Sequence, residues 1–390
     1  MSGTGEGLEM IHLNTAGQGR MPDPVRTVLT ECVRVEDRFG PHELEERVGD
    51  LVHGEVHQRL ERLLNTPDGH TELFTGGAAA FDALVSGLAL GKRDRVWTTP
   101  YESAAHLATL RSVRDRTRCR LEVVPLRPDG DLDLDWMSAH IDDSVALVSV
   151  PHVPANRGIV NPVADIGRLL APHRCLYAVD AAYSLGQLPV DIADIGCHLL
   201  TGDGWRFLRG PRSVGFAYVS ARLRDALSRA EVADEAPRAA ALASPVPTTA
   251  AVAAFASVLS HRAARPALSY EGLIPALRGA VAGVAGVELL APGRRPSAML
   301  AFHHPELSAA LIRRGLAERG VAVRKTVADE TPLLARHATA TPALCVSLDE
   351  GTTQQDIDDF AEALAAVVAE IRPRRDVPRT DPARIALVGS

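Results

Sequence analysis

Short apolar runs alternate with segments of helical periodicity through the first 220 residues. Six runs predict strands because each is apolar and bounded by turn residues; they cover residues 95–100, 121–126, 145–153, 175–182, 197–202 and 215–220. Helical patterns between them cover residues 78–90, 102–113 and 162–173. Several strands are apolar on both faces, as a sheet covered by helices requires. This order predicts an α/β fold with a doubly wound, mostly parallel sheet.

The pattern changes in the last third of the chain. A helical block at 247–264 precedes a smaller α+β pattern, which begins near residue 272 and ends in a long amphipathic helix. Because a single core stops growing at roughly 250–300 residues, a chain of 390 residues is expected to form more than one unit. We predict an N-terminal arm (1–25), a large domain (26–271), a small C-terminal domain (272–372) and a flexible, Pro- and Arg-rich tail (373–390).

Composition narrows the class of protein. A net charge of −7 disfavours a nucleic-acid partner. The five cysteines are scattered without a CxxC pair, which disfavours a disulfide framework or a zinc site and favours the reducing cytoplasm. No run is long and apolar enough to predict a membrane span or a secretory leader. We therefore expect a cytoplasmic protein with a small-molecule substrate, no membrane association and no metal.

Lysine is rare in this chain. Only Lys92 and Lys325 are lysines among 42 basic residues of the Lys and Arg types. An arginine keeps its charge but cannot act as an imine-forming nucleophile, so the two cations are not interchangeable at a catalytic amine. The basic residue in the stretch HLLTGDGWRFLRGP, which follows a predicted buried strand, is Arg206.

Five motifs, in this order, carry a family resemblance: IHLNTAGQGRMP, ELFTGGAAAFDAL, HVPANRGIVNP, YAVDAAYSLGQLPVDIADIGCHLLTGDGWRFLRGPRSVGFAYVS and LCVSLDEGTTQQDIDDFAEAL. The chain resembles the class V aminotransferase-fold enzymes, pyridoxal-phosphate (PLP) proteins that include cysteine desulfurases, amino-acid epimerases and carbon–sulfur lyases. The resemblance implies fold type I, with a seven-stranded, mostly parallel sheet in a large domain and a small α+β C-terminal domain. It also implies a homodimer with active sites at the subunit interface.

The same resemblance implies a set of cofactor contacts, and the chain departs from most of them. The departures are Arg206 for the Schiff-base lysine, Asp203 for a phosphate-binding Ser or Thr, Trp205 for a His, Ala79 for a hydroxyl, Ser103 for the ring-stacking side chain, Ala155 for the side chain at the ring hydroxyl, Tyr183 for a Gln, Pro245-Val246 for a Gly-Thr pair and Cys345 for the substrate-binding Arg. Asp180, which would bond the ring nitrogen, is retained. The backbone amides of Gly77 and Ala78 could still hold an anion at a helix N-terminus.

These departures lead to a functional hypothesis. We expect a vestigial PLP site and no cofactor, in an enzyme repurposed for a small anionic or amino-acid-derived metabolite by lyase- or transferase-like chemistry. The expected catalytic residues are Arg206, Asp203, Tyr183 and His106. Because a buried carboxylate is costly when unpaired, Arg206 is expected to pair with Asp180 or Asp203.

Two other hypotheses stay open at this point. The chain could be a non-catalytic subunit that forms a heterodimer with a lysine-bearing paralogue, or an enzyme that holds PLP or its amine form (PMP) non-covalently. Each polar candidate also has a structural interpretation: Tyr183 could fill the space of the ring, and His106, His152 and Cys345 could be buried core residues. Arg157 could face the pocket or the solvent.

Overall fold

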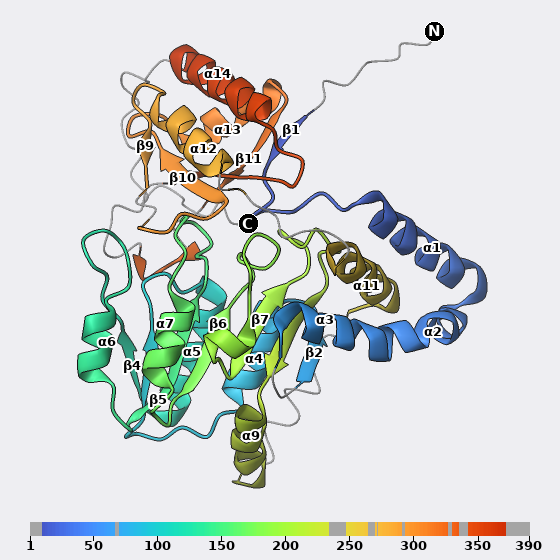
Figure 1. The fold of residues 1–390 in the computed structure, drawn as a ribbon, viewed down its shortest axis with the longest axis vertical. Helices are drawn as coiled ribbons and strands as arrows, with labels where there is room; N and C mark the ends of the chain where they lie inside the picture. Colours follow the sequence, from blue (N-terminus) through green and yellow to red (C-terminus); the bar gives the residue numbers. More distant parts are fainter. Residues whose placement is uncertain are drawn as a thin grey trace, which may run out of the picture.

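A computed structural model describes residues 10–66, 70–233, 247–263, 270, 272–290, 293–326, 330–334 and 342–371. Figure 1 shows two lobes, a larger one with helices on both faces of its sheet and a smaller one stacked above it. In the described residues no helix is long and apolar enough to cross a bilayer. The predicted tail 373–390 and the Pro245-Val246 pair lie outside these ranges.

The larger lobe contains a seven-stranded sheet. Its strands are β2 (His70–Phe74), β3 (Arg95–Thr98), β4 (Arg120–Val123), β5 (Val145–Pro151), β6 (Leu176–Asp180), β7 (Leu199–Asp203) and β8 (Gly215–Val219), in the spatial order β2-β8-β7-β6-β5-β3-β4. All neighbouring pairs are parallel except those of β8, which runs antiparallel to β2 and β7. The predicted α/β class and the mostly parallel sheet are confirmed.

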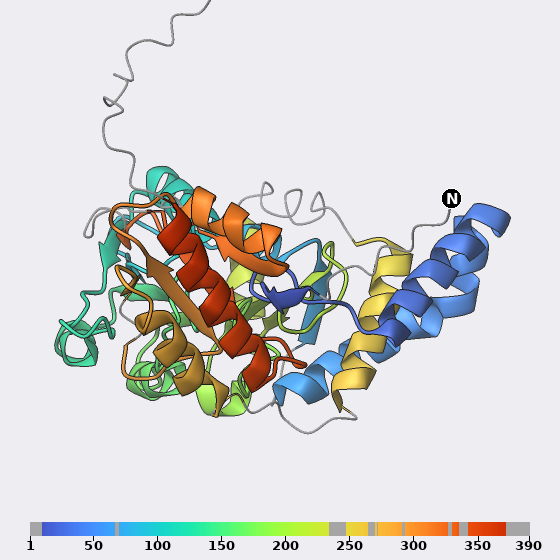
Figure 2. The same ribbon diagram turned by 90° about the horizontal axis from the view of Figure 1, so that it is seen from above.

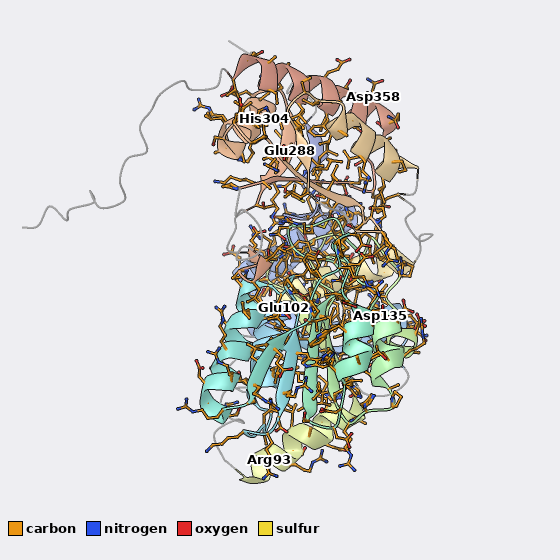
Figure 3. The ribbon with its side chains drawn as sticks, turned by 90° about the vertical axis from the view of Figure 1, so that its left-hand side faces the viewer. Arg93, Glu102, Asp135, Glu288, His304 and Asp358 are labelled. Atoms are coloured by element: carbon orange, nitrogen blue, oxygen red, sulfur yellow. The ribbon has the colours of Figure 1, made fainter. Side chains whose placement is uncertain are left out.

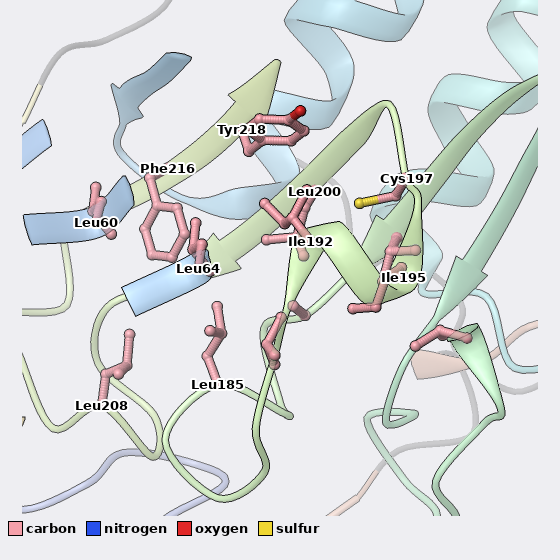
Figure 4. Packing of buried hydrophobic residues seen from close by; sticks show 14 of the residues in the cluster. Leu60, Leu64, Leu185, Ile192, Ile195, Cys197, Leu200, Leu208, Phe216 and Tyr218 are labelled. Carbon is pink, nitrogen blue, oxygen red and sulfur yellow. The ribbon is translucent and has the colours of Figure 1, made fainter. Parts of the chain in front are cut away.

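Helices cover this sheet because its central strands are apolar on both faces. The covering helices include α4 (Gly77–Ser86), α5 (Ala104–Thr117), α6 (Leu134–His140), α7 (Val163–Leu170) and α8 (Ile192–Ile195), and α9 (Ala221–Ala233) follows β8. Figure 4 shows Leu200 of β7 and Phe216 of β8 packed against Leu64 in one buried cluster. Each such side chain stabilises the fold by roughly 1.5–3 kcal/mol relative to exposure.

A helical arm packs on one side of the larger lobe. It consists of α1 (Asp23–Phe39), α2 (Pro41–Asp50), a π-helical turn (Leu51–Glu55), α3 (Val56–Leu64) and α11 (Thr249–Ala263). Figure 2 shows α1 and α11 side by side, although more than 200 residues separate them. The segment between β8 and the small lobe therefore returns to the first helices of the chain.

The smaller lobe contains a five-stranded sheet. Its strands are β1 (Ile11–Leu13), β9 (Glu288–Leu289), β10 (Met299–His303), β11 (Val321–Lys325) and β12 (Leu344–Ser347), in the order β1-β11-β12-β10-β9. Its helices are α12 (Leu273–Ala282), α13 (Ala309–Glu318) and α14 (Gln354–Glu370). Strand β1 pairs in parallel with β11, so part of the predicted N-terminal arm completes the C-terminal sheet.

The two lobes meet at the carboxyl ends of the parallel strands. Strands β6 and β7 are neighbours, and they end at Asp180 and Asp203. In open α/β sheets this edge is where ligands bind. The fold therefore brings two acidic side chains to the edge of the sheet that faces the small lobe.

Candidate functional site

The side chain of Asp203 lies at the N-terminus of α4. Its Oδ1 accepts a hydrogen bond from the backbone N–H of Gly77 at 2.9 Å, and its Oδ2 accepts one from Nε of Arg206 at 3.0 Å. A Cβ on Gly215 would lie 2.3 Å from the Gly76 backbone, so only glycine lets β8 pass this close to the helix. The Asp203 carboxylate thus occupies the position at which a helix N-terminus favours an anion.

Arg206 contacts a carboxylate, a backbone carbonyl and two aromatic rings. Besides its ion pair with Asp203, its Nη1 donates to the carbonyl oxygen of Ala16 at 2.6 Å. Its guanidinium carbon lies 3.9 Å from the centre of the Tyr183 ring and 5.6 Å from that of Trp205. Of the two partners expected for Arg206, the structure pairs it with Asp203. A guanidinium held in this way is a binding or structural group and not a nucleophile.

Two cations lie near the ring of Tyr183. Arg324, on β11 of the small lobe, places its guanidinium carbon 5.6 Å from the centre of the same ring. Tyr183 is 7% exposed, and burial raises the pKa of its phenol, although Arg206 and Arg324 act to lower it. The phenol is therefore protonated at neutral pH and can donate a hydrogen bond.

Arg324 is a candidate that the sequence analysis missed. Its Nη1 donates to the carbonyl oxygen of Ala155 at 2.8 Å, and its Nη2 lies 2.7 Å from Glu330 Oε1. In the register of β11 and β12, Arg324 is directly opposite Cys345. Burial raises the pKa of the Cys345 thiol to about 11, which makes that thiol unreactive. Only the strand pairing reveals that a guanidinium lies beside Cys345.

Asp180 lies in a different environment from Asp203. Its Oδ1 accepts a hydrogen bond from the backbone N–H of Ala182 at 2.9 Å, and its Oδ2 lies 3.9 Å from Nδ1 of His106. Burial raises the pKa of Asp180, and His106 acts in the opposite direction. The same imidazole nitrogen lies 3.4 Å from Oε1 of Glu102, a second residue that the sequence analysis missed. Its signal was the i,i+4 spacing of Glu102 and His106.

Two other predicted site residues, and two residues whose role the sequence left open, have ordinary structural surroundings. Ser103 is the N-cap of α5 and accepts a hydrogen bond from the His106 backbone N–H, while Ala78 is exposed on α4. Burial lowers the pKa of His152 to about 4, so this imidazole is neutral at pH 7. Arg157 is half-buried, and desolvation lowers its pKa.

The two lysines lie away from these carboxylates. Lys92 lies in the turn before β3, Lys325 is the last residue of β11, and both are exposed. All five cysteines are buried and free. Within one chain, neither amine is on the turn after β7 that carries Arg206.

Known proteins with a similar sequence or fold include cysteine desulfurases. A probable cysteine desulfurase of Halobacterium salinarum is 28% identical over 219 residues, which cover 54% of this chain and 52% of that protein. The chain spans about half the length of the curated relatives it matches. The apo cysteine desulfurase of Thermococcus onnurineus NA1 has the same fold, with a TM-score of 0.81 at 16% identity over 93% of this chain and 95% of that one.

A third comparison corrects the expectation about the cofactor. A mutant of C-DES with glycine covalently linked to its PLP cofactor matches with a TM-score of 0.75 at 17% identity, over 91% of this chain and 96% of that one. The model of the class-V aminotransferase family matches residues 32–360. The family match, together with this PLP-containing neighbour, contradicts the prediction that no cofactor is used. The chain therefore belongs to the class-V aminotransferase family and is related to the cysteine desulfurases.

Proposed function

We propose that this protein holds PLP or PMP without a covalent bond to a lysine of its own chain and acts on a small amino-acid-derived substrate. The observation that carries the proposal is the contrast between Asp180, a buried carboxylate at the end of β6, and the exposed positions of both lysines. Asp180 can accept a hydrogen bond from a protonated ring nitrogen. Neither lysine amine is placed beside it.

The ring end of the proposed site fits the cofactor. The side chain of Asp180 is 12% exposed, and its Oδ1 accepts a hydrogen bond from the N–H of Ala182. Its Oδ2 faces His106 at 3.9 Å, which is longer than a hydrogen bond. This oxygen therefore retains capacity for a donor from a bound ring.

The part of the proposed site that would hold the phosphate fits the cofactor less well. The N–H of Gly77 is one of the helix N-terminal donors that a phosphate would use, and Asp203 already accepts its hydrogen bond. A phosphate at this place would have to displace the Asp203 carboxylate or be repelled by it. Binding through the ring end, with a weakened phosphate end, is the arrangement that these residues favour.

When bound, PLP supplies an electron sink for a carbanion formed on an amino-acid substrate. The residues of this chain provide the surroundings for that chemistry. Tyr183 holds a proton on its phenolic oxygen, and the guanidinium groups of Arg206 and Arg324 lie on its ring at 3.9 and 5.6 Å. Both cations add positive charge that attracts a substrate carboxylate, and each also has a carboxylate partner of its own, Asp203 for Arg206 and Glu330 for Arg324.

A titration with PLP and PMP tests the proposal. We expect saturable binding to the wild-type protein, followed by absorbance and by isothermal calorimetry, and at least tenfold weaker binding to Asp180→Asn. The control is Asp82→Asn, because Asp82 lies on α4 and bonds Thr109 on α5. Absence of saturable binding to the wild type, or equal weakening by the control, contradicts the proposal.

Borohydride reduction tests the absence of a covalent link. In the wild type we expect no stoichiometric pyridoxyl-lysine after reduction, measured by peptide mass spectrometry. Arg206→Lys introduces an amine on the turn after β7, and its chain is expected to carry a label at position 206. A single saturating label on Lys92 or Lys325 of the wild type would contradict non-covalent binding.

A further inference from the structure

A buried group of three titratable side chains lies at the ends of β3 and β6. Glu102 precedes α5, His106 lies in its first turn, and Asp180 ends β6. The side chains of Glu102 and His106 are 0% and 3% exposed, and that of Asp180 is 12% exposed. Figure 3 shows Glu102 in the part of the larger lobe that is nearer the small lobe.

Glu102 is held as a hydrogen-bond acceptor. Its Oε2 accepts hydrogen bonds from the hydroxyls of Thr98 at 3.1 Å and Ser149 at 2.7 Å. Its Oε1 accepts one from the backbone N–H of Ser103 at 3.2 Å and lies 3.4 Å from His106 Nδ1. An ionised carboxylate accepts without donating, so this set of donors suits the charged form of Glu102.

His106 is fixed by packing and by charge. Its ring stacks on Phe81 of α4 with centroids 3.9 Å apart and planes 9° apart. Desolvation acts to lower its pKa, but the carboxylates of Asp180, Glu102 and Asp203 outweigh it, and the pKa is raised. These charged groups face the imidazole from the turn before α5, from β6 and from β7, and Asp203 is itself paired with Arg206.

The charges of this group do not balance. With all three groups ionised, the carboxylates of Glu102 and Asp180 face one imidazolium, which leaves a net charge of −1. Arg206 does not supply the missing cation, because its ion pair is with Asp203. A buried uncompensated carboxylate is costly, so the group favours a ligand that brings a positive charge to Asp180.

We propose that Glu102 and His106 are positioning residues that favour the ionised form of Asp180, ready for the protonated ring nitrogen of PLP or PMP. This inference rests on the proposed function. The stack on Phe81 orients the imidazole, the nearby Glu102 carboxylate favours its charged form, and the imidazolium favours the Asp180 carboxylate. Neither Glu102 nor His106 needs to touch the cofactor.

An NMR titration of the ligand-free protein tests the pair without any activity assay. The His106 signal is identified by its loss in His106→Asn, and its midpoint in the wild type is expected above 6.5, the ordinary value for histidine. Glu102→Gln and Asp180→Asn should each lower that midpoint by about one pH unit. A wild-type midpoint at or below 6.5, or a midpoint that neither variant changes, overturns the proposal.

Binding measurements extend the test to the cofactor. His106→Asn should weaken PLP binding about tenfold, the equivalent of one pKa unit of lost preference for the ionised Asp180. His57→Asn is the matched control, because His57 is half-buried and bonds Thr71 on β2. Unchanged affinity in His106→Asn overturns the positioning role even if the wild type binds PLP. If the wild type binds none, the proposed function fails and the NMR midpoints alone decide the pair.

A second variant is used if the first one does not fold. If Glu102→Gln does not give a folded protein by circular dichroism, Ser149→Ala removes one hydroxyl donor to Glu102 and keeps its charge. We expect Ser149→Ala to shift the midpoint of the His106 titration measurably, because Glu102 loses one of its hydrogen-bond donors. An unchanged midpoint in Ser149→Ala would then count against the pair.

Discussion

Asp180 and Asp203 end neighbouring strands, yet their surroundings differ. Asp203 has a backbone N–H of Gly77 on one oxygen and the guanidinium of Arg206 on the other. Asp180 has one backbone N–H and an imidazole 3.9 Å away. The chain neutralises Asp203 internally and leaves Asp180 short of a cation. We infer that Asp203 stabilises the fold, whereas Asp180 is available to a ligand.

The largest expected effect comes from breaking the Asp203 pair. Asp203→Ala leaves the guanidinium of Arg206 and the N–H of Gly77 without the carboxylate, and should lower the free energy of unfolding by about 3–5 kcal/mol. Urea unfolding at pH 7 measures this loss. The double variant Asp203→Ala/Arg206→Leu should recover most of it, because it removes the buried charge. A loss below 1 kcal/mol in Asp203→Ala would show that the pair is not structural.

The next effect concerns His152, whose backbone N–H donates to the carbonyl oxygen of Asp180. Because burial lowers its pKa to about 4, the folded protein resists protonation that the unfolded chain accepts. Stability should fall as pH falls from 6.5 towards 4, by up to about 3 kcal/mol.

Unfolding curves at a series of pH values measure the effect of His152, and His152→Phe should flatten this part of the profile. His106 is expected to act in the opposite sense, because its pKa is raised. Its contribution is fully present below 6.5 and is lost as pH rises through the raised value. If the free energy of unfolding changes with pH in the same way in His152→Phe and His106→Asn, the two buried histidines do not differ in their effect on stability.

A smaller effect is expected at Ser103, where the resemblance implies a ring-stacking side chain. The structure shows an N-cap, so Ser103→Ala should cost about 1 kcal/mol of stability. PLP affinity should change by less than about twofold, since the cap itself does not need to reach the ring. Thermal unfolding and the PLP titration measure the two quantities. A large loss of affinity with unchanged stability would assign Ser103 to the ligand instead.

The smallest change in stability is expected for Asp180→Asn. Since burial raises the pKa of Asp180, its ionisation is less favourable in the folded protein than in the unfolded chain. At pH values above the pKa of Asp180 in the folded protein, this cost lowers the free energy of unfolding. Asp180→Asn removes the charge, so the free energy of unfolding at pH 7 should stay within about 1 kcal/mol of the wild-type value or rise slightly. If Asp180→Asn lowers the free energy of unfolding as much as Asp203→Ala does, the two carboxylates contribute equally to stability and the contrast between them is wrong.

Periodicity was enough to predict most of the larger lobe. All six predicted strands overlap observed ones, because strands that are apolar on both faces must lie inside a covered sheet. Strands β1, β2 and β11 were not among the predicted strands. Strands β1 and β11 are fixed by pairing with each other across more than 300 residues, and β2 by pairing with β8.

The candidate site was predictable only in part. The motif around Arg206 identified the turn after β7, and the cost of a buried carboxylate indicated an acidic partner. Arg324 was missed because its neighbours Tyr183 and Ala155 lie far away in the sequence. Glu102 lies only four residues before His106, and that spacing was overlooked. The expected absence of a cofactor was wrong: lost contacts in a sequence do not show which remaining groups still suit a ligand.

The sequence by itself determined the class of the fold, the position of most strands of the larger lobe along the chain and the scarcity of lysine. These follow from local patterns and composition, which need no knowledge of distant contacts. Only the tertiary structure decided that Arg206 pairs with Asp203, that Arg324 lies opposite Cys345 and that His106 faces Asp180. Such charges are stabilised or destabilised by groups within a few ångströms, and the packing of strands and helices sets those distances.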